Sequence, residues 1–130
     1  MIAIDTNILV RYLVSDDAGQ AGAARRLFEN ELSAESPGFV SVASVVELEW
    51  VLRSGYGFAA GAIGTAIVGL IDTPNLIFES EAAVRRAAGE GPGGFVDRLI
   101  HFVGAEFGCE RTLTFDRRFA RLDGVELLGR

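Results

Sequence analysis

The feature that most constrains the fold is the alternation of short apolar runs with longer helical segments along the 130-residue chain. The runs are apolar throughout and do not alternate apolar with polar residues. Strands of this kind are buried on both faces, which is typical of a parallel sheet with helices on both sides. The length suits one domain with a full core. We therefore expect an α/β fold in which residues 1–130 form a single domain.

The predicted elements follow one another without a linker or an internal repeat. Strands are predicted at residues 2–4, 39–42, 75–78, 111–114 and 125–128. Helices are predicted at residues 7–14, 18–32, 43–52, 58–71, 82–88 and 95–107, with a helical turn at 117–120. In open parallel sheets the functional crevice lies outside the carboxyl ends of the strands. The residues that follow each strand are therefore the first candidates for a site.

The uncharged stretch at residues 54–71 is just long enough to raise the question of a membrane span. Its five glycines and short apolar centre instead favour a buried helix that packs closely on its neighbours. The first residues have no basic segment followed by a long apolar stretch, so we expect no signal peptide. These features together predict a cytoplasmic protein without a membrane segment.

The rare residues exclude several classes of chemistry. With Cys109 as the only cysteine, one chain has neither an internal disulfide nor a cysteine-based metal centre. All twelve basic residues are Arg, which excludes mechanisms that need a lysine. The net charge of −6 argues against a protein that binds nucleic acid through a large excess of positive charge. It does not exclude a nucleic-acid enzyme, because a carboxylate-lined metal site contributes to that negative charge.

Four acidic residues stand at corresponding places in the predicted topology. Asp5 and Asp116 directly follow the first and a late strand, Asp97 lies in the first turn of a helix, and Glu47 lies in the helix after the second strand. Each has a simpler interpretation, such as capping a helix, starting a turn or pairing with an Arg. Because all four are predicted near one edge of the sheet, we favour a shared site.

Among the four acids, Glu47 is the strongest indication of a functional site. Helical spacing predicts that it shares a side of its helix with Leu48 and Val51, while Glu49 points the opposite way. A carboxylate on an apolar side needs an Arg, a metal ion or protonation. Converging carboxylates repel one another, and Mg²⁺ or Mn²⁺ removes that cost. Metal-assisted phosphodiester hydrolysis suits this set of residues best.

The sequence resembles the PIN-domain family, and most of all the VapC-type toxins of bacterial toxin–antitoxin pairs. The resemblance covers nearly the whole chain. Four segments carry it in order: MIAIDTNILVR at residues 1–11, the run to ELEWVL at 41–52, FVDRLI at 95–100 and TFDRRF at 114–119. It implies a central parallel sheet with the strand order 3-2-1-4-5 and helices on both faces.

The same resemblance implies a function and a set of site residues. Asp5, Glu47, Asp97 and Asp116 would be catalytic and would hold the metal, with Thr6, Asn7 and Thr114 as supporting groups. The implied activity is Mg²⁺-dependent endoribonuclease cleavage by a metal-activated water, with Mn²⁺ as a possible substitute. The implied partners are RNA, a VapB-type antitoxin and a second copy of the chain in a homodimer.

Three further residues are candidates for contact with substrate. Arg117 and Arg118 directly follow Asp116 and are expected to contact the RNA backbone, whereas Arg25 and Arg26 are expected on a solvated helix face. His101 lies four residues after Asp97, so it could bond that carboxylate or meet substrate, although we favour a packed histidine. For the aromatic residues Trp50, Tyr56 and Phe58 we expect core packing rather than base stacking. The glycine-rich loop at residues 91–94 leaves open whether Asp97 has a fixed position.

Two other functions stay open at this point. The chain could be a PIN-fold module that binds RNA or protein with little turnover, or a general RNA-processing nuclease outside a toxin system. A phospho-receiver domain and a haloacid-dehalogenase phosphatase share the acidic sheet edge, but both need a lysine.

Overall fold

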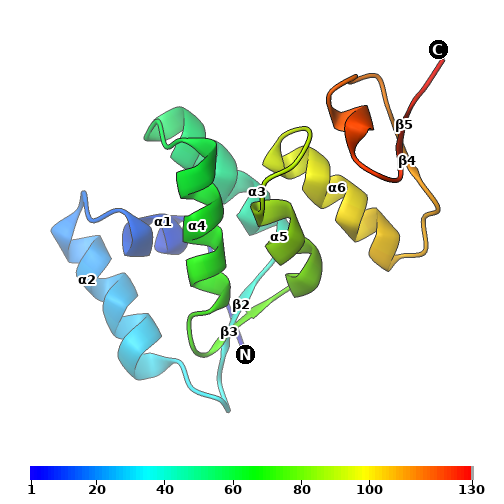
Figure 1. The fold of residues 1–130 in the computed structure, drawn as a ribbon. Helices are drawn as coiled ribbons and strands as arrows, with labels where there is room; N and C mark the ends of the chain where they lie inside the picture. Colours follow the sequence, from blue (N-terminus) through cyan, green and yellow to red (C-terminus); the bar gives the residue numbers. More distant parts are fainter. Residues whose placement is uncertain (130) are drawn as a thin grey trace. The chain divides into compact units, whose positions relative to one another are not determined.

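The computed structural model describes residues 1–129, which form two compact units. The first unit is Met1–Glu79 and the second begins at Ser80 (Figure 1). Strands and helices alternate along the chain as the sequence predicts, and every described strand pairs in parallel. The α/β class is therefore confirmed.

The first unit is built on a three-stranded parallel sheet in the order β1-β2-β3. Its strands are β1 (Ile2–Ala3), β2 (Gly38–Val40) and β3 (Leu76–Phe78). Gly38 in the central strand is buried, and an added Cβ would lie 2.9 Å from Leu76 and 3.0 Å from both Ile4 and Leu32. A larger residue would therefore require the neighbouring apolar side chains to shift, because they occupy the space that a Cβ would need.

Four helices accompany this sheet in the first unit (Figure 1). They are α1 (Thr6–Leu13), α2 (Ala18–Arg26), α3 (Val42–Trp50) and α4 (Ala60–Ile71). One π-helical turn extends α2 over Leu27–Glu31, and another extends α3 over Val51–Gly55. The first three helices begin at side chains that accept a backbone N–H, those of Asp5, Asp17 and Ser41.

Helix α4 occupies the stretch that raised the membrane question. Ile63, Ile67 and Leu70 are buried on one side of the helix, and Gly64 is buried with them. Gly61 and Gly69 are exposed and have open space beside them, so of the three glycines in this helix only Gly64 is buried. In the described chain no helix is both long and apolar enough to span a membrane.

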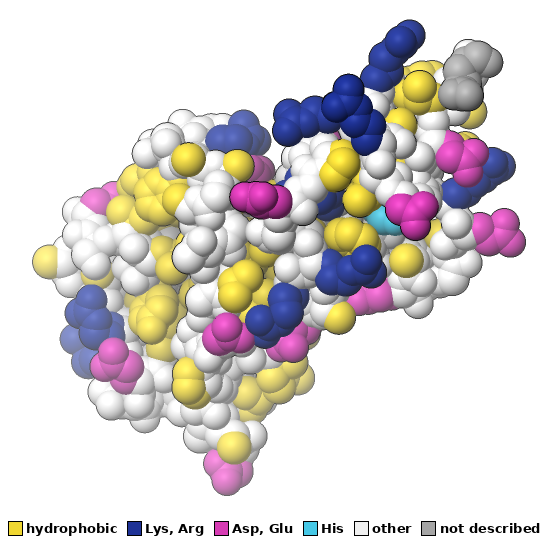
Figure 2. Space-filling model, in the orientation of Figure 1, with side chains coloured by type: hydrophobic (Ala, Val, Ile, Leu, Met, Phe, Trp, Pro, Cys, Tyr) yellow, Lys and Arg dark blue, Asp and Glu magenta, His cyan; other side chains and the backbone are white. Residues whose placement is uncertain are grey.

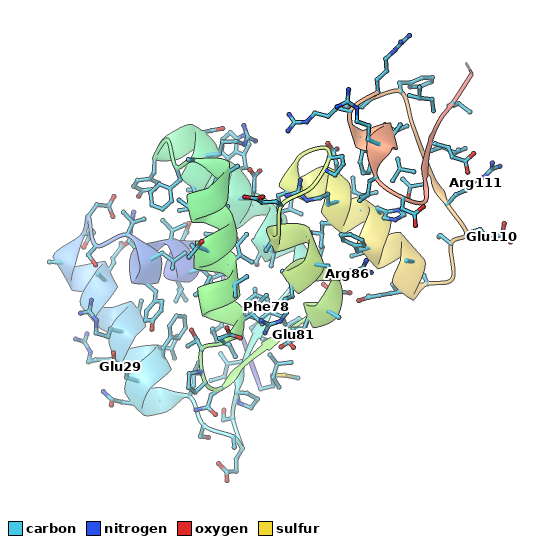
Figure 3. All side chains as sticks on the ribbon, viewed as in Figure 1. Glu29, Phe78, Glu81, Arg86, Glu110 and Arg111 are labelled. Carbon is cyan, nitrogen blue, oxygen red and sulfur yellow. The ribbon has the colours of Figure 1, made fainter. Side chains whose placement is uncertain are left out.

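The second unit pairs two helices with a small parallel sheet. Its elements are α5 (Glu81–Ala88), α6 (Phe95–Glu106), β4 (Thr112–Thr114), the 3₁₀ turn η3 (Phe119–Arg121) and β5 (Val125–Leu127). Helices α5 and α6 pack against each other. Arg86 of α5 is labelled in Figure 3. Its guanidinium carbon lies 4.1 Å from the centre of the Phe102 ring of α6.

The predicted strand order is matched only in part. The described strands form two sheets, β1-β2-β3 and β4-β5, which preserve the 3-2-1 and 4-5 portions of the expected order 3-2-1-4-5. Each strand is only two or three residues long and makes few ladder hydrogen bonds. Runs this short carry too little sequence pattern to specify which edges pair.

Candidate active site

Asp5 stands where β1 passes into α1. Ile4 before it is buried at 3% exposure, so the alternation along the extended chain turns the Asp5 side chain outward. The backbone N–H of Thr6 donates to Oδ1 of Asp5 at 2.8 Å. This bond fixes the carboxylate at the helix N-terminus and leaves Oδ2 available to a ligand.

The structure reverses the predicted orientations of the two glutamates on α3. Glu47 is exposed, whereas Glu49 is buried at 8% exposure on the same side as Val45 and Leu48. Glu49 is compensated by Arg53, whose Nε donates to Oε2 of Glu49 at 2.9 Å. The prediction that Glu47 is the carboxylate on the apolar side was therefore wrong. An exposed Glu47 without an ion pair in its own unit is nevertheless free to bind a ligand.

Asp97 lies in the first turn of α6, as the sequence predicts. Its Oδ2 accepts the backbone N–H of Gly94 at 3.1 Å. An added Cβ on Gly93, which has a φ of +80°, would lie 3.3 Å from the Cβ of Asp97 and 3.0 Å from the ring of Phe119. Asp97 is thus tied to the glycine loop by a hydrogen bond and by close packing.

Arg98 holds the loop at residues 91–94 through hydrogen bonds to backbone carbonyls. Its Nε and Nη2 donate to the carbonyl of Ala87 at 3.1 and 3.0 Å. Its Nη1 donates to the carbonyls of Gly91 and Gly93 at 3.1 and 2.6 Å. Partial burial lowers the pKa of the Arg98 guanidinium, although the charge of Asp97 raises it, and Arg stays protonated in proteins. These four bonds give the loop before Asp97 a defined path, which answers the question that its glycines left open.

Asp116 organises the turn after β4. Its Oδ1 accepts the backbone N–H groups of Arg118 and Phe119 at 2.8 and 3.0 Å. Its own N–H donates to the hydroxyl of Thr114 at 3.0 Å. Thr114 therefore supports the backbone at Asp116, and Oδ2 of this exposed carboxylate is left available.

His101 packs inside the second unit. Its Nδ1 lies 2.8 Å from the hydroxyl of Thr112, and an added Cβ on Gly124 would lie 2.9 Å from its ring. These contacts agree with the packed interpretation of this histidine. Trp50 differs from expectation, because its side chain is 59% exposed and it does not pack in the core.

The four acids are divided between the two units. Asp5 and Glu47 belong to the first unit, and Asp97 and Asp116 belong to the second. Within residues 1–79, and likewise within 80–129, no three His, Cys, Asp or Glu side chains are placed to hold a metal ion. A site that uses all four acids therefore needs groups from both units and stays a prediction.

Comparison with known proteins identifies the family. Residues 2–125 match the PIN domain, which is nearly the whole described chain. The chain belongs to the PIN-domain family. A search of curated proteins found no match. PIN domains are generally metal-dependent nucleases and commonly act on RNA, so the acidic positions of this PIN domain are the place to look for a metal site.

The donor chemistry of this PIN domain fits a hard divalent cation. Three other carboxylates are neutralised by an Arg within their unit, those of Asp16, Glu49 and Glu126. None of the four candidate acids is paired in this way within its own unit. Unpaired carboxylate oxygens are the ligands that Mg²⁺ and Mn²⁺ prefer.

A cavity of about 720 Å³ opens beside Asp5 in the first unit of the PIN domain. Its wall includes Asn7 and Arg11 of α1 and Arg26 of α2. Thr6, predicted as a supporting group, does not line this cavity, and its side chain is buried at 2% exposure. The contact of Arg26 with this cavity could not be predicted from the sequence, because the adjacent Arg25 has the same charge and stands on the same helix.

A hydrogen-bonded cluster holds Arg11 in the wall of this cavity. Its Nε donates to Oε1 of Gln20 at 2.6 Å, and its Nη1 donates to Oδ1 of Asp16 at 2.9 Å and to the hydroxyl of Tyr56 at 3.1 Å. The hydrogen bond that Arg11 donates to Tyr56 is the main cause of the raised pKa of Arg11, and the bond that Tyr56 donates to Asp16 is the main cause of the lowered pKa of Asp16. Both groups are thereby kept in their charged forms.

The second unit presents exposed Arg side chains of its own. Arg117 and Arg118 are exposed after Asp116, and Arg117 and Arg121 line a cavity of about 420 Å³. Figure 2 shows dark blue side chains gathered on the unit that carries η3 and β5. Their exposure makes them available to phosphate groups.

Proposed function

We propose that this PIN domain is a Mg²⁺-dependent endoribonuclease and the toxin component of a type II, VapBC-like toxin–antitoxin system. The observation that carries the proposal is the coincidence of the family match with four acids that no Arg neutralises within their own units. The RNA substrate and the toxin role rest on the resemblance to VapC-type toxins.

In this proposal Asp5, Glu47 and Asp97 hold the metal, and Asp116 completes the acidic set near a second metal or the attacking water. Mg²⁺, or Mn²⁺ in its place, would supply Lewis acidity at the scissile phosphate and a nucleophilic water at neutral pH. Three of the four carboxylates, those of Asp5, Asp97 and Asp116, are pre-positioned by a hydrogen bond from a nearby backbone N–H. Pre-positioned ligands lower the cost of assembling the site.

The other candidate residues orient the acidic groups or bind the RNA. Asn7 offers an amide beside Asp5, and Thr114 holds the turn that carries Asp116. Arg117 and Arg118 contact the RNA backbone, where guanidinium groups form charge-assisted hydrogen bonds with phosphate. His101 is a weaker candidate for substrate contact, because Thr112 already occupies its Nδ1.

We also propose the partners and the location of the chain. A VapB-type antitoxin holds the enzyme inactive, the chain forms a homodimer, and both proteins act in the cytoplasm. Size-exclusion chromatography with light scattering, with and without the neighbouring gene product, tests the dimer and the antitoxin together.

Cleavage of a 5′-labelled RNA by the purified chain tests the nuclease directly. We expect cutting with Mg²⁺ or Mn²⁺, none with EDTA, and at least a 100-fold lower rate in Asp5→Asn. The matched control is Asp123→Asn, which removes an exposed carboxylate outside the proposed site. Equal rates in Asp5→Asn and the parent would overturn the assignment.

Expression in growing cells tests the toxin role separately. We expect growth arrest with the parent chain, normal growth with Asp5→Asn, and rescue by the adjacent small gene product. Metal-dependent cleavage without growth arrest would instead indicate a general RNA-processing nuclease. RNA binding without cleavage would indicate a binding module.

A further inference from the structure

The cavity beside Asp5 has the size and the lining of a ligand site. Its volume of about 720 Å³ lies within the range of 300–1,000 Å³ common for small-molecule sites. Its walls come from three consecutive elements of the first unit, namely α1, α2 and the π-helical turn after α2. One wall therefore carries a candidate catalytic carboxylate, and the opposite elements carry groups that the proposed chemistry does not use.

Arg11 gives this cavity a cation whose position is fixed in advance. Gln20, Asp16 and Tyr56 occupy its Nε and Nη1, and within residues 1–79 its Nη2 makes no hydrogen bond. The free Nη2 has two N–H groups to offer an anion. A guanidinium already held by its neighbours loses little conformational entropy on binding.

Arg26 adds a second cation of a different kind. It is exposed, it lines the cavity, and it makes no ion pair within its unit. The adjacent Arg25 is also exposed but does not line the cavity. The two arginines therefore form a natural comparison for any ligand that carries a phosphate.

The rest of the lining suits the flat face and the polar edge of a nucleobase. Ile8, Ala23 and Leu27 provide apolar surface. The amide of Asn7 and the carboxylate of Glu31 provide hydrogen-bonding groups for a base edge. A base in a duplex is stacked and paired, so only an unpaired base has both its face and its edge free for such a cavity.

We propose that this cavity binds the unpaired nucleotide next to the cleaved bond in single-stranded RNA, with Arg11 and Arg26 on its phosphate. The inference rests on the proposed nuclease function, because it places the reacting phosphodiester beside Asp5. Two cations with free N–H groups favour a nucleotide over an apolar protein segment as the occupant.

Equilibrium binding of a fluorescent single-stranded RNA in EDTA tests the subsite without cleavage. We expect Arg26→Gln to weaken binding roughly tenfold, as for loss of a charge-assisted phosphate contact, and to reduce the salt slope by about 1. The matched control Arg25→Gln should change affinity less than twofold. A duplex RNA of the same sequence should bind more weakly than the single strand.

A second variant fills the cavity without disturbing the core. Ala23 is an exposed residue of α2 that lines the cavity, so Ala23→Glu places a carboxylate against the bound phosphate. We expect it to weaken RNA binding by more than tenfold, while Ala62→Glu, at an exposed position on α4, leaves binding unchanged.

The outcomes separate the subsite from the nuclease. If the parent does not bind RNA in EDTA, or if Arg26→Gln and Ala23→Glu bind as the parent does, the subsite is overturned even when cleavage still depends on Asp5. If both variants weaken binding but no chain cleaves RNA, the subsite stands and the nuclease fails. Variants that lose only the affinity for a protein partner would assign the cavity to that partner and overturn the RNA proposal.

Discussion

The hydroxyl of Tyr56 donates to Oδ2 of Asp16 at 2.7 Å and ties the end of the helix that begins with α3 to the loop before α2. The same hydroxyl accepts a hydrogen bond from Nη1 of Arg11 at 3.1 Å. Three segments of the first unit therefore meet at one phenol.

Removing this phenol oxygen should loosen the cluster. We expect Tyr56→Phe to lower the urea midpoint of unfolding and to weaken RNA binding, because Arg11 loses one of the bonds that hold it. Urea titration followed by circular dichroism measures the first effect. Tyr12→Phe is the matched control, since in the described residues Tyr12 contacts the ring of Phe28 and makes no side-chain hydrogen bond. Equal midpoints for both variants would argue against the cluster.

The same contact predicts a pH dependence. Hydrogen bonding to Tyr56 lowers the pKa of Asp16, so the folded state favours the carboxylate form. The resulting stabilisation is complete above the unfolded pKa of about 3.9 and is lost as the pH falls through the lowered folded value. We expect Asp16→Asn to be less stable than the parent at pH 7 and to approach the stability of the parent as the pH falls through that lowered value. Asp123→Asn should follow the parent throughout the range.

The reversed glutamates of α3 predict opposite phenotypes. Glu47→Gln should reduce RNA cleavage at least 100-fold with little change in stability, because the exposed side chain has no partner in its unit. Glu49→Gln should preserve cleavage within about threefold and lower stability by about 1 kcal/mol, since a buried carboxylate loses its bond to Arg53. Glu29→Gln, an exposed carboxylate labelled in Figure 3, controls for loss of charge. The opposite pattern would assign the site to Glu49.

Arg98 should matter for stability without touching substrate. Arg98→Ala removes four hydrogen bonds to the carbonyls of Ala87, Gly91 and Gly93, and we expect a loss of about 2 kcal/mol. Arg98→Lys should restore only part of this, because an ammonium group cannot reproduce the planar fork. Chemical denaturation measures the loss, with the exposed Arg121→Ala as control. A loss below about 0.5 kcal/mol would show that these bonds contribute little.

Alanine substitutions at Gly93 and Gly108 distinguish the cost of backbone strain from the cost of side-chain crowding. Both have a positive φ, but an added Cβ meets Phe119 and Asp97 at Gly93 and nothing within 4 Å at Gly108. We expect Gly108→Ala to cost about 1 kcal/mol and Gly93→Ala about 2–3 kcal/mol. Thermal unfolding of the two variants gives the comparison. Equal losses would mean that the loop shifts freely around position 93.

The sequence predicted the elements well because their periodicities are strong. The helix predicted at residues 95–107 is observed as α6, and the strand predicted at 75–78 is observed as β3. The helix predicted at 18–32 is continuous, but its last turn is π-helical. Hydrophobic periodicity indicates which residues are buried, but it does not indicate which backbone hydrogen bonds they make. The change from α-helix to π-helix was therefore not predictable.

The sequence did not reveal which side of α3 is buried. Apolar residues surround this helix at Val42, Val45, Val46 and Leu48, so their spacing defines no single face. The burial of Glu49 is set by the tertiary structure and by Arg53, one turn later. The roles of Arg26 and Arg98 depend in the same way on cavity and loop geometry that no local pattern encodes.

Trp50 is the only tryptophan of the chain, it is exposed, and it follows Glu47 by three positions on one helix, where side chains are neighbours. The molecule thus contains an intrinsic fluorophore beside Glu47, one of the proposed metal ligands. Changes in its emission spectrum upon titration with divalent ions or oligonucleotides would report occupancy in real time, with no dye attached and no turnover required.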